Sequence, residues 1–222
     1  MNKPQMYKIY INEVEVILKP TSEITLDDVL KDKSIVVNYT GIKKDLMDYI
    51  TIPEQYLRSE KLIIHYSDFD KLKSDFKSFY MEIEAGGGLV RNEFGEYLFI
   101  YRRGSWDLPK GKIELNETKK EATLREISEE TGIKKMKIVD KLITTRHTYR
   151  TNTGKRIIKK SHWYLIDSVK QPLVPQKSED IEKAVWMTME NFLSKKRKVY
   201  PNILDVINCR LTNITENKVK IN

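Results

Sequence analysis

Three glutamates stand at positions that an α-helix brings onto one face, within an arc of about 100°: Glu126, Glu129 and Glu130. Carboxylates three or four residues apart on a helix repel each other and lower its stability. The repulsion is removed if a cation lies among them, and oxygen ligands suit a hard divalent ion such as Mg²⁺. Two such ions would clamp a phosphoryl group and lower the pKa of a bound water. A solvated helix face, screened by water and lysines, is the alternative.

The helix that would carry these glutamates is predicted to run from Thr118 to Gly132. Thr118 and Glu121 match the S/T-x-x-E capping box, and a glycine suits a helix C-terminus. Leu124 and Ile127 lie on another side of this helix and can anchor it on a sheet, so the charged arc need not be its solvated back.

The spacing of residues around this helix follows a known pattern. Gly111 is followed after five residues by Glu117, and seven residues later the chain reads REISEETGI, residues 125–133. This matches the Nudix box, G-x5-E-x7-R-E-U-x-E-E-x-G-U with U aliphatic, without one departure. A chance match at a given start has a probability on the order of 10⁻⁹. Residues 80–205 therefore resemble a Nudix hydrolase.

The resemblance implies an α/β fold, an α/β/α sandwich with a mixed sheet. It also implies an enzyme that hydrolyses a nucleoside diphosphate linked to another moiety, with Mg²⁺ or Mn²⁺ as cofactor. It assigns metal binding and catalysis to Glu126, Glu129 and Glu130, adds Gly111 to the metal site and the entering loop, and gives structural roles to Glu117, Arg125 and Gly132. The base that activates water is expected to be Glu129 or an acid outside the box, such as Glu179 or Glu182.

The segment SWDLPKGK before the box is similar to Nudix members that cleave dinucleoside polyphosphates or diphosphoinositol polyphosphates. A long polyphosphate gripped by several cations is therefore expected to be a better substrate than ADP-ribose or a nucleotide sugar. The residues expected to contact it are Arg102, Arg103, Lys110, Lys112, His147 and Tyr149. Solvated surface and plain strand patterning are the alternatives for these residues.

Two other functions stay open for this chain. One is a Nudix-fold sensor that binds a nucleotide or RNA without cleaving it, although such a protein is expected to lose box glutamates. The other is a pyrophosphohydrolase acting on RNA 5′ ends. The net charge of +8 at pH 7 would suit an RNA substrate, although the sequence carries no RNA-binding signature.

The composition is that of a globular protein: 222 residues, 40% hydrophobic and 32% charged. Cys209 is the sole cysteine, which excludes an intrachain disulfide and fits a reducing cytoplasm. A secretory signal and a membrane span are not expected, because apolar runs are short and interrupted. We expect a phosphorylated small molecule as partner, no membrane, nucleic acid with less support, and a possible homodimer.

The elements that position these residues are predicted from periodicity, and they divide the chain into two domains. Residues 1–79 alternate short strand and helix patterns and are predicted to form a small α+β domain of unknown role. Residues 80–222 form the expected Nudix domain with C-terminal helices. Three glycines at 86–88 interrupt a strand pattern there, which indicates a bulge or a close approach of backbone to another segment.

Overall fold

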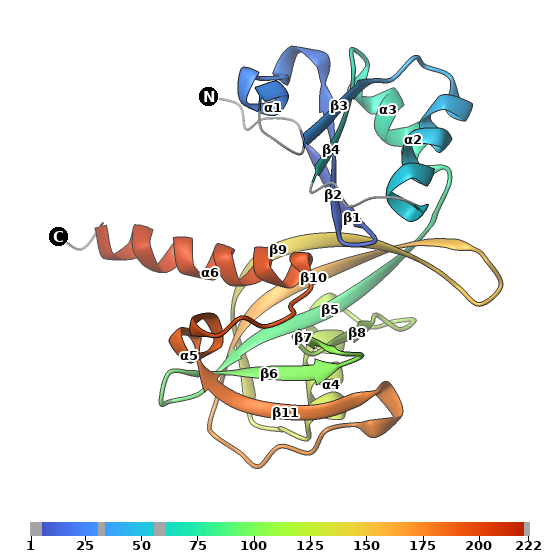
Figure 1. The fold of residues 1–222 in the computed structure, drawn as a ribbon. Coiled ribbons are helices and arrows are strands. Elements are labelled where there is room, and N and C mark those ends of the chain that lie inside the picture. The colour runs from blue at the N-terminus through green and yellow to red at the C-terminus, as the bar shows by residue number, and fades with distance from the viewer. Residues whose placement is uncertain (1–5, 31–33, 56–60, 220–222) are drawn as a thin grey trace. The chain divides into compact units, whose positions relative to one another are not determined.

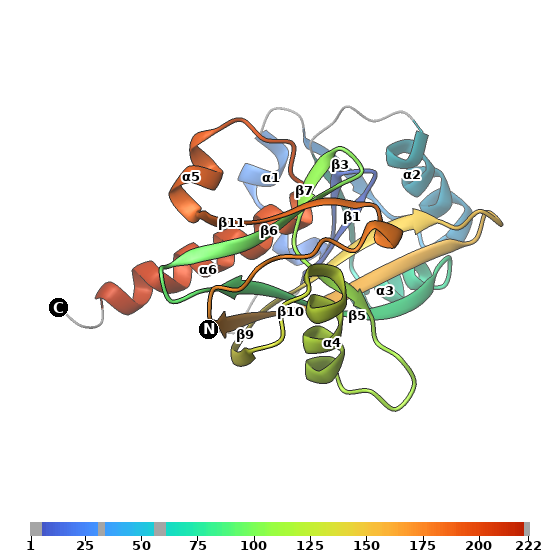
Figure 2. The ribbon, with the colours of Figure 1, turned by 90° about the horizontal axis from the view of Figure 1, so that it is seen from below.

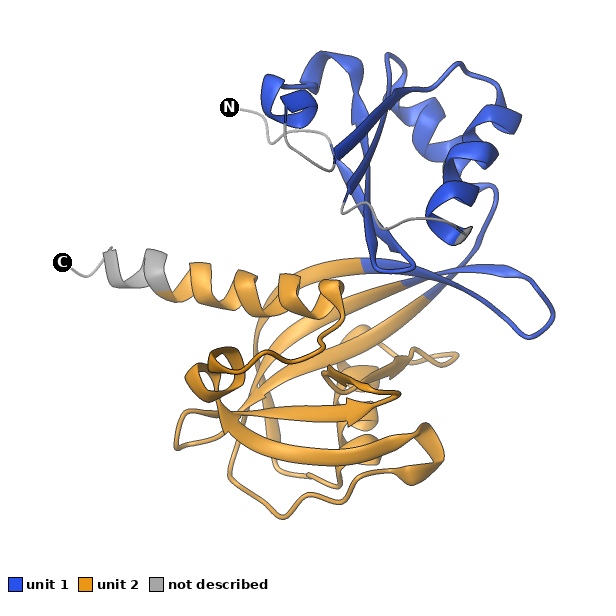
Figure 3. Ribbon diagram, in the orientation of Figure 1, with its two compact units in different colours: residues 1–83, 146–159 blue, residues 84–145, 160–222 orange. Residues whose placement is uncertain are grey.

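The computed structural model describes residues 6–30, 34–55 and 61–219. It divides into two compact units, one of residues 1–83 and 146–159 and the other of residues 84–145 and 160–222, called unit 1 and unit 2 (Figure 3). Unit 1 thus contains a segment far along the chain, which the predicted division at residue 79 assigned to the second domain. Within the described ranges, no helix combines the length and the apolar character that crossing a membrane requires.

In the described residues up to Lys77, unit 1 forms four short strands, three α-helices and one 3-10 turn (Figure 1). The strands are β1 (Tyr7–Ile11), β2 (Val14–Pro20), β3 (Ser34–Asn38) and β4 (Lys61–Tyr66). The helices are α1 (Leu26–Leu30), α2 (Lys43–Gln55) and α3 (Phe69–Lys77), with η1 at Thr21–Glu23. The first two strands form a hairpin, and Asn12 and Glu13 at its turn have φ of 48° and 70°, as a two-residue turn of mirror-image type requires.

The strands of unit 1 follow the order β1-β2-β4-β3. β1 and β2 are antiparallel, whereas β4 runs parallel to both of its neighbours. One apolar cluster joins this sheet to α2 and α3, with Ile9, Leu46 and Phe76 among its fully buried members. Unit 1 is therefore a small α+β body with a core of its own.

Unit 2 contains the sheet that supports the box, in the order β11-β6-β5-β10-β9. Its strands are β5 (Met81–Arg91), β6 (Glu96–Arg102), β7 (Ser105–Asp107), β8 (Lys110–Lys112), β9 (Met136–Arg150), β10 (Arg156–Ser168) and β11 (Ile181–Thr188). Its helices are α4 (Lys119–Thr131), α5 (Met189–Ser194) and α6 (Pro201–Val219), with η2 at Lys177–Glu179. β5, β9 and β10 each extend past the unit boundaries.

Neighbouring residues on the strands of unit 2 pack into two different cores. Phe99 and Trp163 belong to the core that includes α5 and α6, whereas Leu98 and Tyr164, one position away, belong to the core that includes Ile127 of α4. Because successive strand side chains point to opposite faces, the helices cover both faces of the sheet (Figure 2). The predicted α/β/α sandwich is confirmed.

The three glycines of β5 lie where backbone and side chains approach the strand closely, as predicted. A Cβ on Gly86 would meet the Oγ1 of Thr123 at 2.5 Å and the carbonyl oxygen of Lys119 at 2.8 Å. A Cβ on Gly87 would meet Trp163 at 2.7 Å. The missing side chains therefore let α4 and the indole ring pack directly on the strand.

The approach of α4 to Gly86 predicts that Gly86→Ala destabilises the protein by about 1 to 3 kcal/mol, because helix backbone must move. Gly88→Ala is the matched control, since its Cβ meets only the ends of Ile127 and Ile166 side chains. Urea unfolding should show the larger loss for Gly86→Ala. Equal losses in the two variants would contradict this account of the helix approach.

Candidate active site

The box helix α4 begins and ends where the sequence predicts. Thr118 accepts a hydrogen bond from the N–H of Glu121, and the Glu121 side chain accepts one from the N–H of Thr118, so the capping box is complete. Gly132 ends the helix with φ of 80°, a left-handed conformation that glycine adopts without strain. Ile127 is fully buried and Leu124 packs beside it, so the helix is anchored on the sheet as expected.

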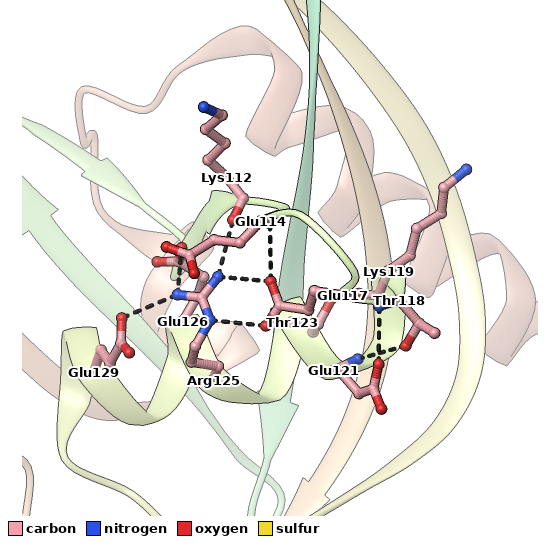
Figure 4. A network of polar contacts seen from close by, with 10 residues as sticks. All are labelled: Lys112, Glu114, Glu117, Thr118, Lys119, Glu121, Thr123, Arg125, Glu126 and Glu129. Atoms are coloured by element: carbon pink, nitrogen blue, oxygen red, sulfur yellow. Dashed lines mark hydrogen bonds and ion pairs between the residues drawn. The ribbon is translucent and has the colours of Figure 1, made fainter.

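Arg125 lies among the acidic side chains of the box (Figure 4). Its Nε and Nη2 donate to the two carboxylate oxygens of Glu117 at 2.8 and 2.9 Å. Its Nη1 donates to Glu126 at 2.9 Å and to Glu129 at 3.1 Å. Hydrogen bonding to Arg125 lowers the pKa of Glu117 below its usual value, and the repulsion on this helix face is offset by one guanidinium.

Glu130 faces the interior, and only 2% of its surface is exposed. One carboxylate oxygen accepts a hydrogen bond from the N–H of Lys110 at 2.8 Å, and the other lies 3.4 Å from a guanidinium nitrogen of Arg102. Burial disfavours the charged form and raises the pKa of Glu130 to about 7, against the opposing effect of Lys110 and Arg102.

The three box carboxylates have different partners in this structure, and their predicted role as a shared metal site stays a prediction. Glu126 and Glu129 contact the same Arg125 nitrogen, whereas Glu130 is bonded to Lys110 on the buried side. Among the described residues, no three acidic, histidine or cysteine side chains gather closely enough to hold a metal ion. Arg125 pairs with Glu126 and Glu129, whereas Glu130 is held on the buried side by the Lys110 N–H and the Arg102 guanidinium.

The donor atoms nevertheless fit a magnesium-like ion. A Cβ on Gly111 would lie 1.9 Å from the Glu126 carboxyl group, so this carboxylate rests against the glycine backbone. Glu129 is half-exposed on the same helix. Mg²⁺ binds through one or two carboxylates and takes its other ligands from water and phosphate, so it does not require a cage of three side chains.

The cationic residues predicted to contact substrate are placed in three different ways. Lys110 is 7% exposed and its ammonium is bonded to Asp107, while Arg102 lies against Glu130. Arg103 is exposed and paired with Asp180 at 2.9 Å. The Lys112 side chain is exposed, and its carbonyl oxygen accepts a bond from Arg125. A phosphate contact from Lys110 or Arg102 thus requires an internal contact to open, and these binding roles stay predictions.

His147 and Tyr149 lie on β9 within unit 1, whereas the box lies within unit 2. Their predicted stacking role therefore also stays a prediction. Glu179 and Glu182, the two acids outside the box, are both exposed on unit 2. Glu182 lines a pocket of about 550 Å³ together with Arg103, Lys177, Asp180 and Ile181.

Glu130 does not line this pocket, but it contacts the sequence neighbours of two lining residues. Arg102 precedes the lining residue Arg103 and contacts the Glu130 side chain. Gln176 precedes the lining residue Lys177, and its N–H donates to the Glu130 carbonyl oxygen at 3.1 Å. A larger pocket of about 710 Å³ lies around Arg91 and Lys135 and is lined by no residue of the box. We therefore do not place the hydrolysis site there.

Sequence reasoning missed Asp107, which is 3% exposed and pairs with Lys110. It stands three residues before Lys110 in the quoted segment SWDLPKGK, and this spacing was the available signal. The short strands β7 and β8 on either side of Leu108 and Pro109 were also missed, because three-residue strands have no measurable periodicity.

A known protein family matches this chain. The model of the NUDIX domain matches residues 82–207, more than half of the chain. The chain belongs to the Nudix hydrolase family. Hydrolases of this family generally use divalent metal ions.

Among curated relatives, the RNA pyrophosphohydrolases of Yersinia enterocolitica and Yersinia pseudotuberculosis are each 30% identical over 138 residues, covering 53% of this chain and 78% of theirs. Among solved structures, the MutT protein from Methanosarcina mazei is 26% identical with a TM-score of 0.47, covering 60% of this chain and 96% of its own. The NUDIX domain of Shewanella oneidensis NrtR, solved with ADP ribose, is 17% identical with a TM-score of 0.48, covering 62% and 92%.

The fork between Arg125 and Glu117 predicts that Arg125→Lys lowers the free energy of unfolding by about 1 to 3 kcal/mol, because an ammonium cannot make the paired, charge-assisted bonds. The matched control is Arg103→Lys, whose exposed ion pair should change stability by less than about 1 kcal/mol. Chemical denaturation of both variants measures the difference. A loss in Arg125→Lys no larger than the control's would contradict this role.

The raised pKa of Glu130 predicts a pH dependence of stability in metal-free buffer. Below about pH 4.5 the group is protonated in both states, so its stabilising contribution is fully present. As the pH rises toward about 7 the unfolded state ionises first, and this contribution is lost. The unfolding free energy of the wild type should therefore fall relative to Glu130→Gln over this range. A difference that stays flat with pH would contradict the assignment.

Proposed function

We propose that this protein is a divalent-metal-dependent pyrophosphohydrolase that cleaves a phosphoanhydride bond in a nucleotide bearing a 5′ polyphosphate. The observation that carries the proposal is the complete box folded as a unit, in which Arg125 connects Glu117, Glu126 and Glu129 on the α4 face. A sensor without activity is expected to lose box glutamates, and all of them are present in this chain.

Glu126, Glu129 and Glu130 would hold the metal, with the Gly111 backbone beside Glu126. When bound, the ion polarises the phosphoryl group and lowers the pKa of water. Arg125 holds the first two carboxylates near each other, and Lys110 orients the third through its N–H. The pocket lined by Glu182 would offer Lys177 to the phosphate groups of the substrate, and Arg103 once its pairing with Asp180 opens.

Glu129 is the proposed base, because 49% of its side chain is exposed and a water molecule can reach it. It would take the proton of the water whose oxygen attacks phosphorus, while the bond from phosphorus to the leaving phosphate oxygen breaks. Glu182 is the second candidate, because it lines the same pocket as Arg103. Single-turnover rates against pH in Glu129→Gln and Glu182→Gln distinguish the two acids.

Loss of a metal-binding carboxylate predicts that Glu129→Gln and Glu130→Gln reduce kcat by orders of magnitude while each variant remains folded. Excess EDTA should abolish turnover of the wild type. Glu190→Gln, a change at an exposed position on α5, is the control and should retain full activity. Full activity in EDTA, or near-native rates in both box variants, would falsify the proposal.

Two substrate classes follow from different observations. The segment Leu108-Pro109-Lys110-Gly111 before the box helix supports a dinucleoside polyphosphate substrate. However, two of the cations expected to bind its phosphates, Arg102 and Lys110, form ion pairs with Glu130 and Asp107. The relatives named RNA pyrophosphohydrolase support a 5′-triphosphate RNA end. We propose the RNA end as the second candidate on the basis of these relatives.

A phosphate-release panel with Mg²⁺ decides between these classes. It compares diadenosine tetraphosphate, a short 5′-triphosphate RNA, ADP-ribose, a nucleotide sugar and a diphosphoinositol polyphosphate. One of the first two is expected to exceed ADP-ribose and the nucleotide sugar by at least about tenfold in kcat/KM, since each well-placed phosphate contact contributes about 1.5 to 3 kcal/mol. Binding without turnover of any of them would instead indicate a sensor.

A further inference from the structure

Four ionisable side chains form a buried group where the segment from β6 to β8 meets α4: Arg102, Asp107, Lys110 and Glu130. Asp107, Lys110 and Glu130 are 3%, 7% and 2% exposed. Charged side chains are rarely this buried unless paired, because removing a charge from water is costly. Each of these four groups therefore depends on its ion-pair or hydrogen-bond partners.

Lys110 has two donors, its backbone N–H and its ammonium group, and they bind two different carboxylates. Its backbone N–H donates to Glu130 at 2.8 Å, whereas its ammonium donates to Asp107. Asp107 is held in place by the N–H of Leu108, which donates to its other oxygen at 2.7 Å. The carboxylate of Glu130 thus lies against Lys110 without pairing with the lysine charge.

This arrangement matters because Glu130 accepts the backbone N–H of the same lysine, and the lysine charge acts on its carboxylate. In an interior of low dielectric, an ammonium that loses its partner turns to the nearest carboxylate. Arg102, the other cation beside Glu130, stands 3.4 Å away, a longer contact than an ideal charged hydrogen bond. An ammonium released from Asp107 would therefore occupy the Glu130 oxygens.

We propose that Asp107 is a positioning residue that holds the Lys110 ammonium away from Glu130, so that Glu130 remains available to a divalent cation. This rests on the proposed function, in which Glu130 is a metal ligand. In this proposal the backbone N–H of Lys110 orients Glu130. The side-chain charge of Lys110 would compete with the metal ion for Glu130, and the ion pair with Asp107 prevents this.

The test measures Mn²⁺ binding to the full chain through the paramagnetic resonance signal of free Mn²⁺. Asp107→Asn and Lys110→Met remove the same ion pair, so a merely structural role predicts equal effects. The proposal predicts an asymmetry. Asp107→Asn leaves a competing ammonium and should weaken Mn²⁺ binding about 10- to 100-fold, the range typical of residues that support metal ligands. Lys110→Met should stay within about threefold of the wild type, because no ammonium competes.

The double variant Asp107→Asn/Lys110→Met should recover Mn²⁺ binding to within about threefold of the wild type. Asp167→Asn, which removes the acidic partner of Arg91 within unit 2, is the matched control and should bind Mn²⁺ as the wild type does. Thermal melts establish that each variant is folded at the temperature of measurement. If Asp107→Asn does not fold, Asp107→Ser replaces it, since the smaller side chain admits water beside the ammonium.

Equal weakening in Asp107→Asn and Lys110→Met overturns the proposal, as does a double variant as weak as Asp107→Asn. Glu130→Gln separates this failure from that of the proposed function. If Glu130→Gln loses Mn²⁺ affinity but Asp107→Asn does not, only the role of Asp107 is overturned. If Glu130→Gln binds as the wild type does, the metal assignment of the proposed function fails and this proposal fails with it.

Discussion

Electrostatic repulsion on the charged face of α4 is the constraint on which the site depends. Glu126 and Glu129 are one turn apart, and Arg125 offsets their repulsion by donating one Nη1 to both. The same guanidinium binds Glu117 through its other nitrogens and the Lys112 carbonyl oxygen through Nη2. A single side chain therefore joins β8, the loop that follows it and the middle of the helix.

The sheet determines where this loop and helix can lie. β8 pairs with β5 so that Gly111 stands opposite Gly86, and α4 packs against Gly86 because that residue has no side chain. The loop must then return Glu117 from the sheet to Arg125 on the helix. In this chain, the intervals of five and seven residues in the box place Gly111 on β8, Glu117 in the loop and Arg125 on α4, where these contacts form.

Unit 1 is stabilised by a comparable arrangement of its own. Glu54 on α2 accepts hydrogen bonds from Arg156 and Arg150, which flank the tip between β9 and β10. These bonds lower the pKa of Glu54, although its partial burial acts in the opposite direction. The two arginines tie residues 146–159 to α2 within this unit, about a hundred residues away in the sequence.

The sequence by itself determined the elements and the box. Helical spacing located the box helix, and caps such as Thr118 and Gly132 are local interactions that sequence neighbours suffice to predict. Tertiary structure alone decided which partner each charge chose. Lys110 pairs with Asp107, Glu130 faces the interior, and residues 146–159 belong to unit 1. The reason is that burial and ion pairing depend on which distant segments the fold brings together, and spacing along a chain does not contain that information.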